Sequence, residues 1–288
     1  SANFGAAWEI GARDALLKSM QVRAGNWVAV VEVHAADVTR SSEIADSAID
    51  IAIAAIQCVI PPGEDDDARG MCRLTGRTLP PWRGSISVAG DKCEIGMKQA
   101  LGMWIPGNTL ENIITQGKQV LNAMGDRILA YVTGVSLLPQ LEQAWCDSAF
   151  WFHEALSEPL DAVAVPKLGI SMEVLLGSDS FRGSRNRSLT AVKAFFNLDS
   201  DQPITPTAVM NVRQFIDYVL EPTARIRHGN WSTLETPIFG SRSDLTMFCK
   251  RLLIVYARRL TKFREDPNAT DGIGPFLEWA IKRTDHQA

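Results

Sequence analysis

Apolar residues spaced three and four apart recur through the second half of the chain, and each run predicts one face of an α-helix. In residues 108–134, for example, Ile113, Val120, Met124 and Ile128 form one apolar stripe. The connections between runs are short, which favours antiparallel neighbours. The pattern therefore predicts an antiparallel helical bundle, with helices within residues 108–134, 137–156, 160–177, 184–197, 205–230 and 241–263.

Proline and glycine positions set limits on two of these helices. Pro139 lies near the first turn of the run 137–156, where a proline is tolerated. Pro166 lies inside the run 160–177 and is expected to bend or break that helix near its start. Gly177 suits the left-handed position that follows a helix, so the same run is expected to end there.

The first 107 residues carry a mixed pattern. Residues 26–38 are rich in β-branched side chains and partly alternate, which predicts a strand. Residues 40–60 have helical spacing, and residues 71–107 are typical of short strands and turns. Residues 1–107 are therefore predicted to form a small α+β subdomain, an α/β platform that precedes the bundle of residues 108–288. The predicted fold class is α+β, mainly α.

Composition and charge limit the environment and the partners. The 288 residues are 46% hydrophobic with a net charge of −4, so any RNA binding must come from a local cluster of cations. The five cysteines lack metal-binding spacing, which indicates a reducing cytoplasm. No apolar stretch is long enough for a membrane span, so no membrane partner is expected. The start at Ser1, without Met, indicates a tag remnant or a piece of a longer protein.

Several enzyme signatures are absent from the sequence. It contains no G-x-x-x-x-G-K-[ST] phosphate loop, no G-x-G-x-x-G after a strand, no G-x-S-x-G and no H-E-x-x-H. The acidic run in PPGEDDDARG (residues 61–70) is expected to be a solvated loop, because hard cations need ligands that converge from a fixed backbone. Neither a metal nor a cofactor is therefore expected.

Four histidines remain as candidates for metal-free chemistry. His34 lies in the predicted strand and His286 lies near the C-terminus. His153 belongs to the aromatic run FWFHEAL, where a buried, hydrogen-bonded core histidine is expected. Only His228 is flanked by charge, in the sequence RIRHGN.

The sequence RIRHGN has two interpretations. On a helix, Arg225 and His228 are three residues apart and share a face, whereas Arg227 points about 100° away. Such a histidine could move the proton of an attacking 2′-hydroxyl while the arginine holds the charge on an RNA phosphate. The structural interpretation is a helix end, because cations in a last turn followed by Gly229 and Asn230 complement the helix dipole and stop the helix.

Four segments, taken in order, make the chain similar to the Apea-like branch of the HEPN superfamily. Within them an aromatic helix ends in Ala-Leu, an apolar helix holds Glu173, and another helix ends in Arg-x-His-Gly. The resemblance implies a HEPN-type bundle and a metal-independent endoribonuclease of prokaryotic antiphage defence or abortive infection, which acts on RNA as a homodimer. The segments are WVAVVEVHAADVTRSSEIADSAIDIAIAAIQCVI, AFWFHEALSEPLDAVAVPKLGISMEVLLG, SRNRSLTAVKAFFNL and IDYVLEPTARIRHGN.

The arginine spacing departs from that family. Its signature is Arg-x(4–6)-His across a dimer seam, and the matching arginine positions here hold Thr223, Pro222 and Glu221. The arginines present are Arg225, which is separated from His228 by two residues, and Arg227, which directly precedes His228. Two outcomes stay open. Either Arg225 substitutes for the family's arginine, or the site is inactive and the fold serves dimerisation or RNA binding.

A second basic group lies on a loop and on the helix that follows it, predicted at residues 184–197, where it could hold a phosphate backbone or form a solvated helix start. Arginines at a helix start oppose the helix dipole, which points to a use other than stability. Glu173 would need a partner if buried, and one of these arginines is a candidate. The residues predicted to bind RNA are Arg182, Arg185, Arg187, Lys193 and Asn230.

Three functional hypotheses follow. The first is a HEPN-type ribonuclease in which His228 is the general acid/base and Arg225 and Arg227 bind phosphate on single-stranded RNA. The second is a catalytically inactive HEPN module for RNA binding, dimerisation or sensing, with RNA or another defence component as its partner. The third places a nucleotide-like ligand between the α+β first half and the bundle, although no phosphate loop supports it.

Overall fold

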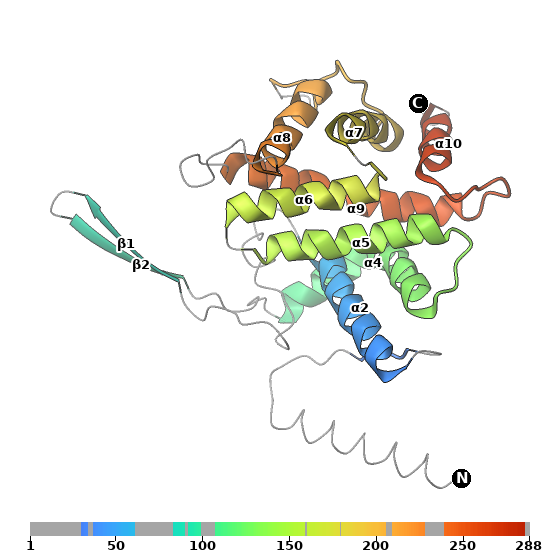
Figure 1. Cartoon of the computed structure of the whole chain (residues 1–288), viewed down its shortest axis with the longest axis horizontal. Helices are drawn as coiled ribbons and strands as arrows, with labels where there is room; N and C mark the ends of the chain where they lie inside the picture. The colour runs from blue at the N-terminus through green and yellow to red at the C-terminus, as the bar shows by residue number, and fades with distance from the viewer. Residues whose placement is uncertain are drawn as a thin grey trace, which may run out of the picture. The chain divides into compact units, whose positions relative to one another are not determined.

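The computed structural model describes most of the chain, and the described residues are mainly helical (Figure 1). They form eight helices and one antiparallel hairpin, which confirms the predicted predominance of helix. The described residues are 30–33, 37–60, 83–89, 92–98, 107–158, 160–178, 180–205, 209–227 and 239–285. The elements are α2 (Val38–Val59), β1 (Arg83–Ala89), β2 (Lys92–Lys98), α4 (Gly107–Thr133), α5 (Pro139–Leu156), α6 (Asp161–Leu175), α7 (Phe181–Phe196), α8 (Val212–Arg227), α9 (Phe239–Phe263) and α10 (Ile273–Asp285).

The predicted α/β platform is not seen in the described parts of residues 1–107. Residues 30–33, within the predicted strand, belong to neither a helix nor a strand. The segment 71–107 contributes the hairpin, in which Arg83 of β1 lies opposite Lys98 of β2. The acidic residues 61–70 lie outside the described residues.

Helix α2 shares the core of the later helices. Its residues Ile51, Ala54 and Cys58 are buried in the same apolar cluster as residues of α4, α5 and α9. The ammonium of Lys250 on α9 donates a hydrogen bond to the carbonyl of Ile60 just after α2. The chain divides into two compact units, Ser1–Glu32 and Val33–Ala288, so α2 lies in the unit of the bundle although the sequence groups it with residues 1–107.

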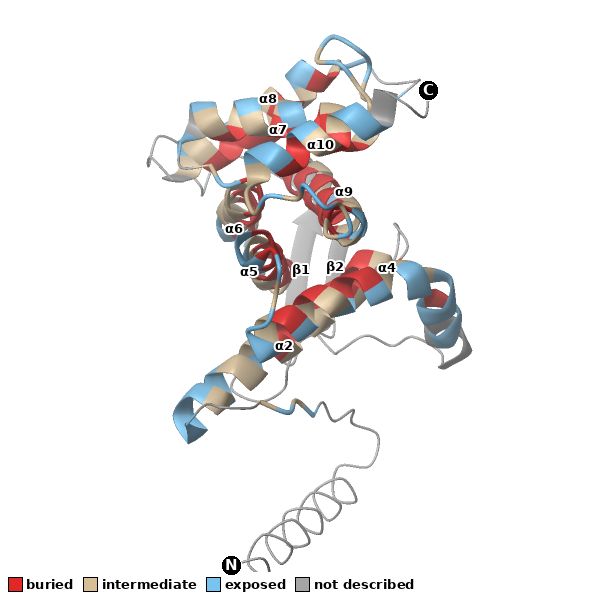
Figure 2. Cartoon of the chain, turned by 90° about the vertical axis from the view of Figure 1, so that its right-hand side faces the viewer, coloured by how far each residue is buried: buried red, intermediate tan, exposed pale blue. Residues whose placement is uncertain are grey.

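The core is built around α5, α6 and α9, where Figure 2 shows buried positions facing one another. Trp145 and Phe152 of α5 are fully buried, and the indole nitrogen of Trp145 donates to the carbonyl of Leu253 at 3.0 Å. Tyr256 of α9 packs edge-on against Phe276 of α10, with ring centroids 4.9 Å apart. These aromatic contacts fix α9 between α5 and α10.

Side chains from distant parts of the chain hold both ends of α5. At its start, the Asp271 carboxylate accepts from the amides of Gln140 at 2.8 Å and Leu141 at 3.1 Å. At its end, the buried guanidinium of Arg242 donates to the carbonyls of Ala155 at 3.1 Å and Glu158 at 2.7 Å. An anion at a helix start and a cation at its end both complement the helix dipole.

Helix α6 continues through Pro166, so of the predicted bend or break the break does not occur. Proline removes one intrahelical hydrogen bond, but the flanking residues Val165 and Leu168 are fully buried and hold the helix in place. Gly177 follows this helix with φ of +59°, as its sequence position predicts. Two later helices start at other residues than predicted: α7 begins at Phe181 and not at residue 184, and α8 begins at Val212 and not at residue 205.

Among the described residues, no helix combines the length and the apolar character needed to cross a membrane.

Candidate functional site

The candidate site lies at the C-terminal end of α8, which finishes at Arg227. Arg225 is exposed in this last turn, and its guanidinium forms an ion pair of 2.5 Å with the Glu221 carboxylate one turn earlier. His228 and Asn230, and the side chain of Arg227, lie outside the part of the chain that the structure describes. The described geometry therefore bears on Arg225 and on the helix that carries it.

The three positions of α8 that correspond to the arginine of the HEPN signature differ in burial. Pro222 and Thr223 are buried, and the Thr223 hydroxyl donates to the carbonyl of Val165 on α6 at 3.4 Å. Glu221 is exposed. A long cationic side chain at 222 or 223 would enter the α6–α8 contact, so this helix offers solvent-facing positions at 221 and 225.

The predicted RNA-binding residues on α7 are mostly engaged within the chain. Arg185 forms two hydrogen bonds with the Asp217 carboxylate of α8, one of them at 2.8 Å. Arg187 donates to the carbonyl of Leu176 at 3.2 Å, and Lys193 pairs with Asp199 at 3.1 Å. These contacts occupy polar groups that an RNA phosphate would otherwise use.

Arg182 differs from its neighbours, because it is exposed and makes no hydrogen bond or ion pair with the described residues.

Helix α7 starts with a cap in which the Ser180 hydroxyl accepts from the amide of Gly183 at 3.2 Å. Glu173 of α6 accepts from the Ser184 hydroxyl at 3.2 Å.

The ion pair between Arg185 and Asp217 perturbs both groups. The hydrogen bond from Arg185 lowers the pKa of Asp217 below its usual range, and the same contact raises the pKa of Arg185. Each charged form therefore stabilises the other. Arg185 is thus committed to joining α7 to α8.

His153 has the buried, hydrogen-bonded setting that the sequence predicts, which confirms its structural role. It is fully buried on α5, and its Nδ1 lies 3.0 Å from the amide oxygen of Gln57 on α2. Its Nε2 lies 3.7 Å from the Asp50 carboxylate, also on α2. The ring therefore bridges α2 and α5 inside the core.

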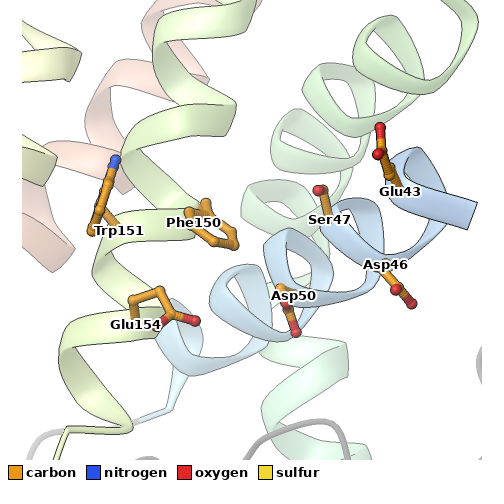
Figure 3. A pocket seen from close by; sticks show the side chains of 7 residues that line it. All are labelled: Glu43, Asp46, Ser47, Asp50, Phe150, Trp151 and Glu154. Carbon is orange, nitrogen blue, oxygen red and sulfur yellow. The ribbon is translucent and has the colours of Figure 1, made fainter. Parts of the chain in front are cut away.

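A pocket of about 510 Å³ opens between α2 and α5 (Figure 3). Figure 3 shows Phe150 and Glu154 of α5 directed toward α2. Two of its carboxylates already have partners on the chain, since Glu43 pairs with Arg40 at 3.0 Å and Glu154 with Lys167 at 3.7 Å. The lining residues are Glu43, Asp46, Ser47, Asp50, Phe150, Trp151 and Glu154.

This pocket has no arrangement that assigns a metal to it. Within the described residues, no group of three or more His, Cys, Asp or Glu side chains could hold a metal ion. The cysteines described, Cys58, Cys146 and Cys249, are buried free thiols, and burial raises the pKa of each above the usual thiol value. They are therefore poor nucleophiles.

Helix α9 carries a set of cations that sequence reasoning missed. Arg251, Arg258 and Lys262 are exposed and Arg259 is half-buried. None of the four makes a hydrogen bond or ion pair with the described residues. Counting charge along this one helix would have found them, because its only acid is Asp244 while its bases are Arg242, Lys250, Arg251, Arg258, Arg259 and Lys262.

Comparison of the chain with protein-family models, with curated proteins and with solved structures gives no match.

Proposed function

We propose that the chain is a HEPN-type, metal-independent endoribonuclease of antiphage defence, which works in the cytoplasm as a homodimer on single-stranded regions of RNA. With this function we propose the corresponding fold, a HEPN-type helical bundle preceded by a small α/β platform. The observation that supports it is the end of α8, where Arg225 is exposed in the last turn and His228 follows directly after the helix.

The proposed chemistry needs one proton acceptor, one proton donor and a phosphate clamp. His228 of one protomer takes the proton of the 2′-hydroxyl, whose oxygen forms a bond to phosphorus as the bond from phosphorus to the 5′-oxygen breaks. The same residue of the partner subunit gives a proton to the leaving 5′-oxygen. Arg225 and Arg227 hold the non-bridging oxygens, because guanidinium groups pair with phosphate through two hydrogen bonds. The products are a 2′,3′-cyclic phosphate and a 5′-hydroxyl.

The ion pair with Glu221 is compatible with a phosphate-binding role for Arg225. Both side chains are more than half exposed, at 55% and 54%. Exposed pairs of this kind contribute only about 0–1 kcal/mol, so an RNA phosphate can replace the carboxylate at small cost. Arg225 thus remains accessible to a ligand.

The test is RNA cleavage in EDTA by wild-type protein and by His228→Ala. We expect the variant to lose at least about 10²-fold in rate, the range in which general acid/base groups contribute. His286→Ala is the matched control, since it removes a histidine near the C-terminus, and it should cleave as the wild type does. Equal rates for wild type and His228→Ala would reject His228 as the catalytic group.

A second candidate function is a catalytically inactive HEPN module for RNA binding, dimerisation or sensing. The observations that favour it are the burial of Pro222 and Thr223 and the internal pairing of Arg185. This candidate predicts self-association without cleavage. Light scattering on wild-type protein, read beside the cleavage assay, separates the two functions.

A further inference from the structure

The exposed cations of α9 lie along one line of the helix. At about 100° per residue, Arg251, Arg258 and Lys262 fall within about 40° of one another around the axis. With a rise of about 1.5 Å per residue, the eleven steps from Arg251 to Lys262 cover about 16 Å. These three residues are called the α9 stripe below.

Helix stability does not explain this arrangement. Arg258 and Lys262 are like charges four residues apart, a spacing that destabilises a helix. Only Lys262 lies in the last turn, where a cation complements the helix dipole. Partial burial, and then the charge of Arg258, lower the pKa of Arg259 beside the stripe, so the cations disfavour one another's charge.

The positions near the stripe do not neutralise it. From Arg251 to Lys262 the helix contains no acidic residue. Of the charged residues just outside it, Lys250 donates to the carbonyl of Ile60 and Arg264 pairs with Asp126 at 3.7 Å. The exposed Glu265 forms no ion pair with the described residues. Helix α9 therefore presents three exposed positive charges without a carboxylate partner among the described residues.

We propose that the α9 stripe binds the phosphodiester backbone of single-stranded RNA. Its charge is complementary to that ligand, and its length of about 16 Å is enough for a few successive phosphates. The residues between the cations, Ile254 and Val255, are half-buried aliphatic side chains, and the stripe contains no aromatic ring on which a base could stack. The contact is therefore with the backbone and is independent of RNA sequence.

This inference rests on RNA as the ligand of the proposed function, but it concerns binding and not cleavage. The test is fluorescence anisotropy of a labelled, mixed-sequence single-stranded RNA in EDTA, over a range of salt concentrations. All proteins carry His228→Ala, so the RNA stays intact whether or not the wild type cleaves it. The stripe variant adds Arg251→Gln, Arg258→Gln and Lys262→Gln.

The matched control adds Arg40→Gln, Arg213→Gln and Lys282→Gln, three exposed cations on α2, α8 and α10. We expect the stripe variant to bind RNA at least about tenfold more weakly, with the slope of log affinity against log salt smaller by about 2, because each lost phosphate contact on a single strand removes about 0.7. The control should change the slope by less than about 1. Unchanged circular dichroism shows that both variants are folded.

Four results decide this inference, and the last of them separates it from the proposed function. Equal affinity and slope for the stripe variant and its His228→Ala parent overturn it, and so does an equal loss in the control. Absence of RNA binding by the parent overturns it as well. Selective loss in the stripe variant supports it even if wild-type protein cleaves no RNA, in which case only the ribonuclease assignment fails.

Discussion

At the scale of single residues, a buried ion pair joins three helices. Arg127 of α4 is fully buried, and its guanidinium contacts the Glu142 carboxylate of α5, which is 3% exposed. The same guanidinium donates to the carbonyl of Ala257 and to the hydroxyl of Thr261 on α9, both at 3.3 Å. Removing one of two opposite charges inside a core leaves the other buried without a partner, which is strongly destabilising, whereas replacing both by apolar side chains is often tolerated.

Removing one member of this pair should therefore be worse than removing both. We expect Glu142→Leu to lower the free energy of unfolding by about 3–5 kcal/mol, because Arg127 is left buried without a carboxylate. The double variant Arg127→Met/Glu142→Leu should be less destabilised than the single one. Urea unfolding followed by circular dichroism measures both. A double variant that is less stable than Glu142→Leu contradicts this reasoning.

The contacts of individual residues were the hardest feature to predict from the sequence. The aromatic surroundings of His153 were enough to predict burial and a hydrogen bond, but not its partner Gln57, which is 96 positions away. Arg127 lies three residues after Met124, beside the predicted apolar stripe, but nothing local identifies Glu142 and the carbonyl of Ala257 as its partners. Partners of this kind depend on which helices meet, and a single sequence does not contain that information.

At the scale of elements, the end of α8 is positioned by a close approach to α6. A Cβ atom added to Gly169 of α6 would lie 2.1 Å from the methyl carbon of Thr223 and 3.0 Å from its hydroxyl. The two helices can be this close only because residue 169 has no side chain. Thr223 lies two residues before Arg225, so this contact also sets the orientation of the candidate site.

Gly169→Ala should push α6 and α8 apart and destabilise the protein by about 1–3 kcal/mol, as overpacking does in cores. Adding Thr223→Ala removes both nearest atoms, so the double variant should lose less stability than the sum of the two single changes. Gly125→Ala on α4 is the control. That position has no atom within 4 Å of the added carbon, and alanine there should stabilise the helix by about 0.5–1 kcal/mol. Similar melting temperatures for Gly169→Ala and Gly125→Ala would exclude the close approach.

The helices of the bundle were largely predictable, and most of their ends lie within two residues of the predicted ones, whereas the starts of α7 and α8 do not. Apolar spacing located α4 to α9, because each helix buries one face. The expected break at Pro166 did not occur, since packing of the buried residues around it compensates for the lost hydrogen bond. Pro139 marks the start of α5 in the sequence, but the side chains that cap its two ends, Asp271 and Arg242, lie far along the chain and could not be predicted. For Arg227, His228 and Asn230, the role in the candidate site remains a prediction from the sequence.

At the scale of the whole molecule, α2 completes the bundle. It buries Ile51, Ala54 and Cys58 against later helices, and it provides Gln57 and Asp50 as neighbours of His153. A bundle that starts at residue 108 would lack this layer. Its partners on α5 and α9, including His153 and Lys250, would then face water.

We therefore expect a fragment of residues 108–288 to unfold at a lower temperature than a fragment of residues 33–288 and to bind a dye specific for exposed apolar surface. The physical reason is the loss of buried apolar area, at roughly 25 cal/mol per Å². Thermal unfolding and dye fluorescence of the two fragments provide the comparison. Equal melting temperatures would show instead that α2 contributes little to the bundle and that residue 107 is a true domain boundary.

The central claim is RNA cleavage by 2′-hydroxyl attack with His228 as the proton-transfer group. The most direct measurement is the chemistry of the RNA ends produced in EDTA by wild-type protein, by mass spectrometry, with His228→Ala and an RNA carrying a 2′-deoxy sugar at the cut position in parallel. We expect 2′,3′-cyclic phosphate and 5′-hydroxyl ends from wild type, and no cut by the variant or at the deoxy position. Intact RNA with the wild type, or cleavage at the deoxy position, would contradict the claim.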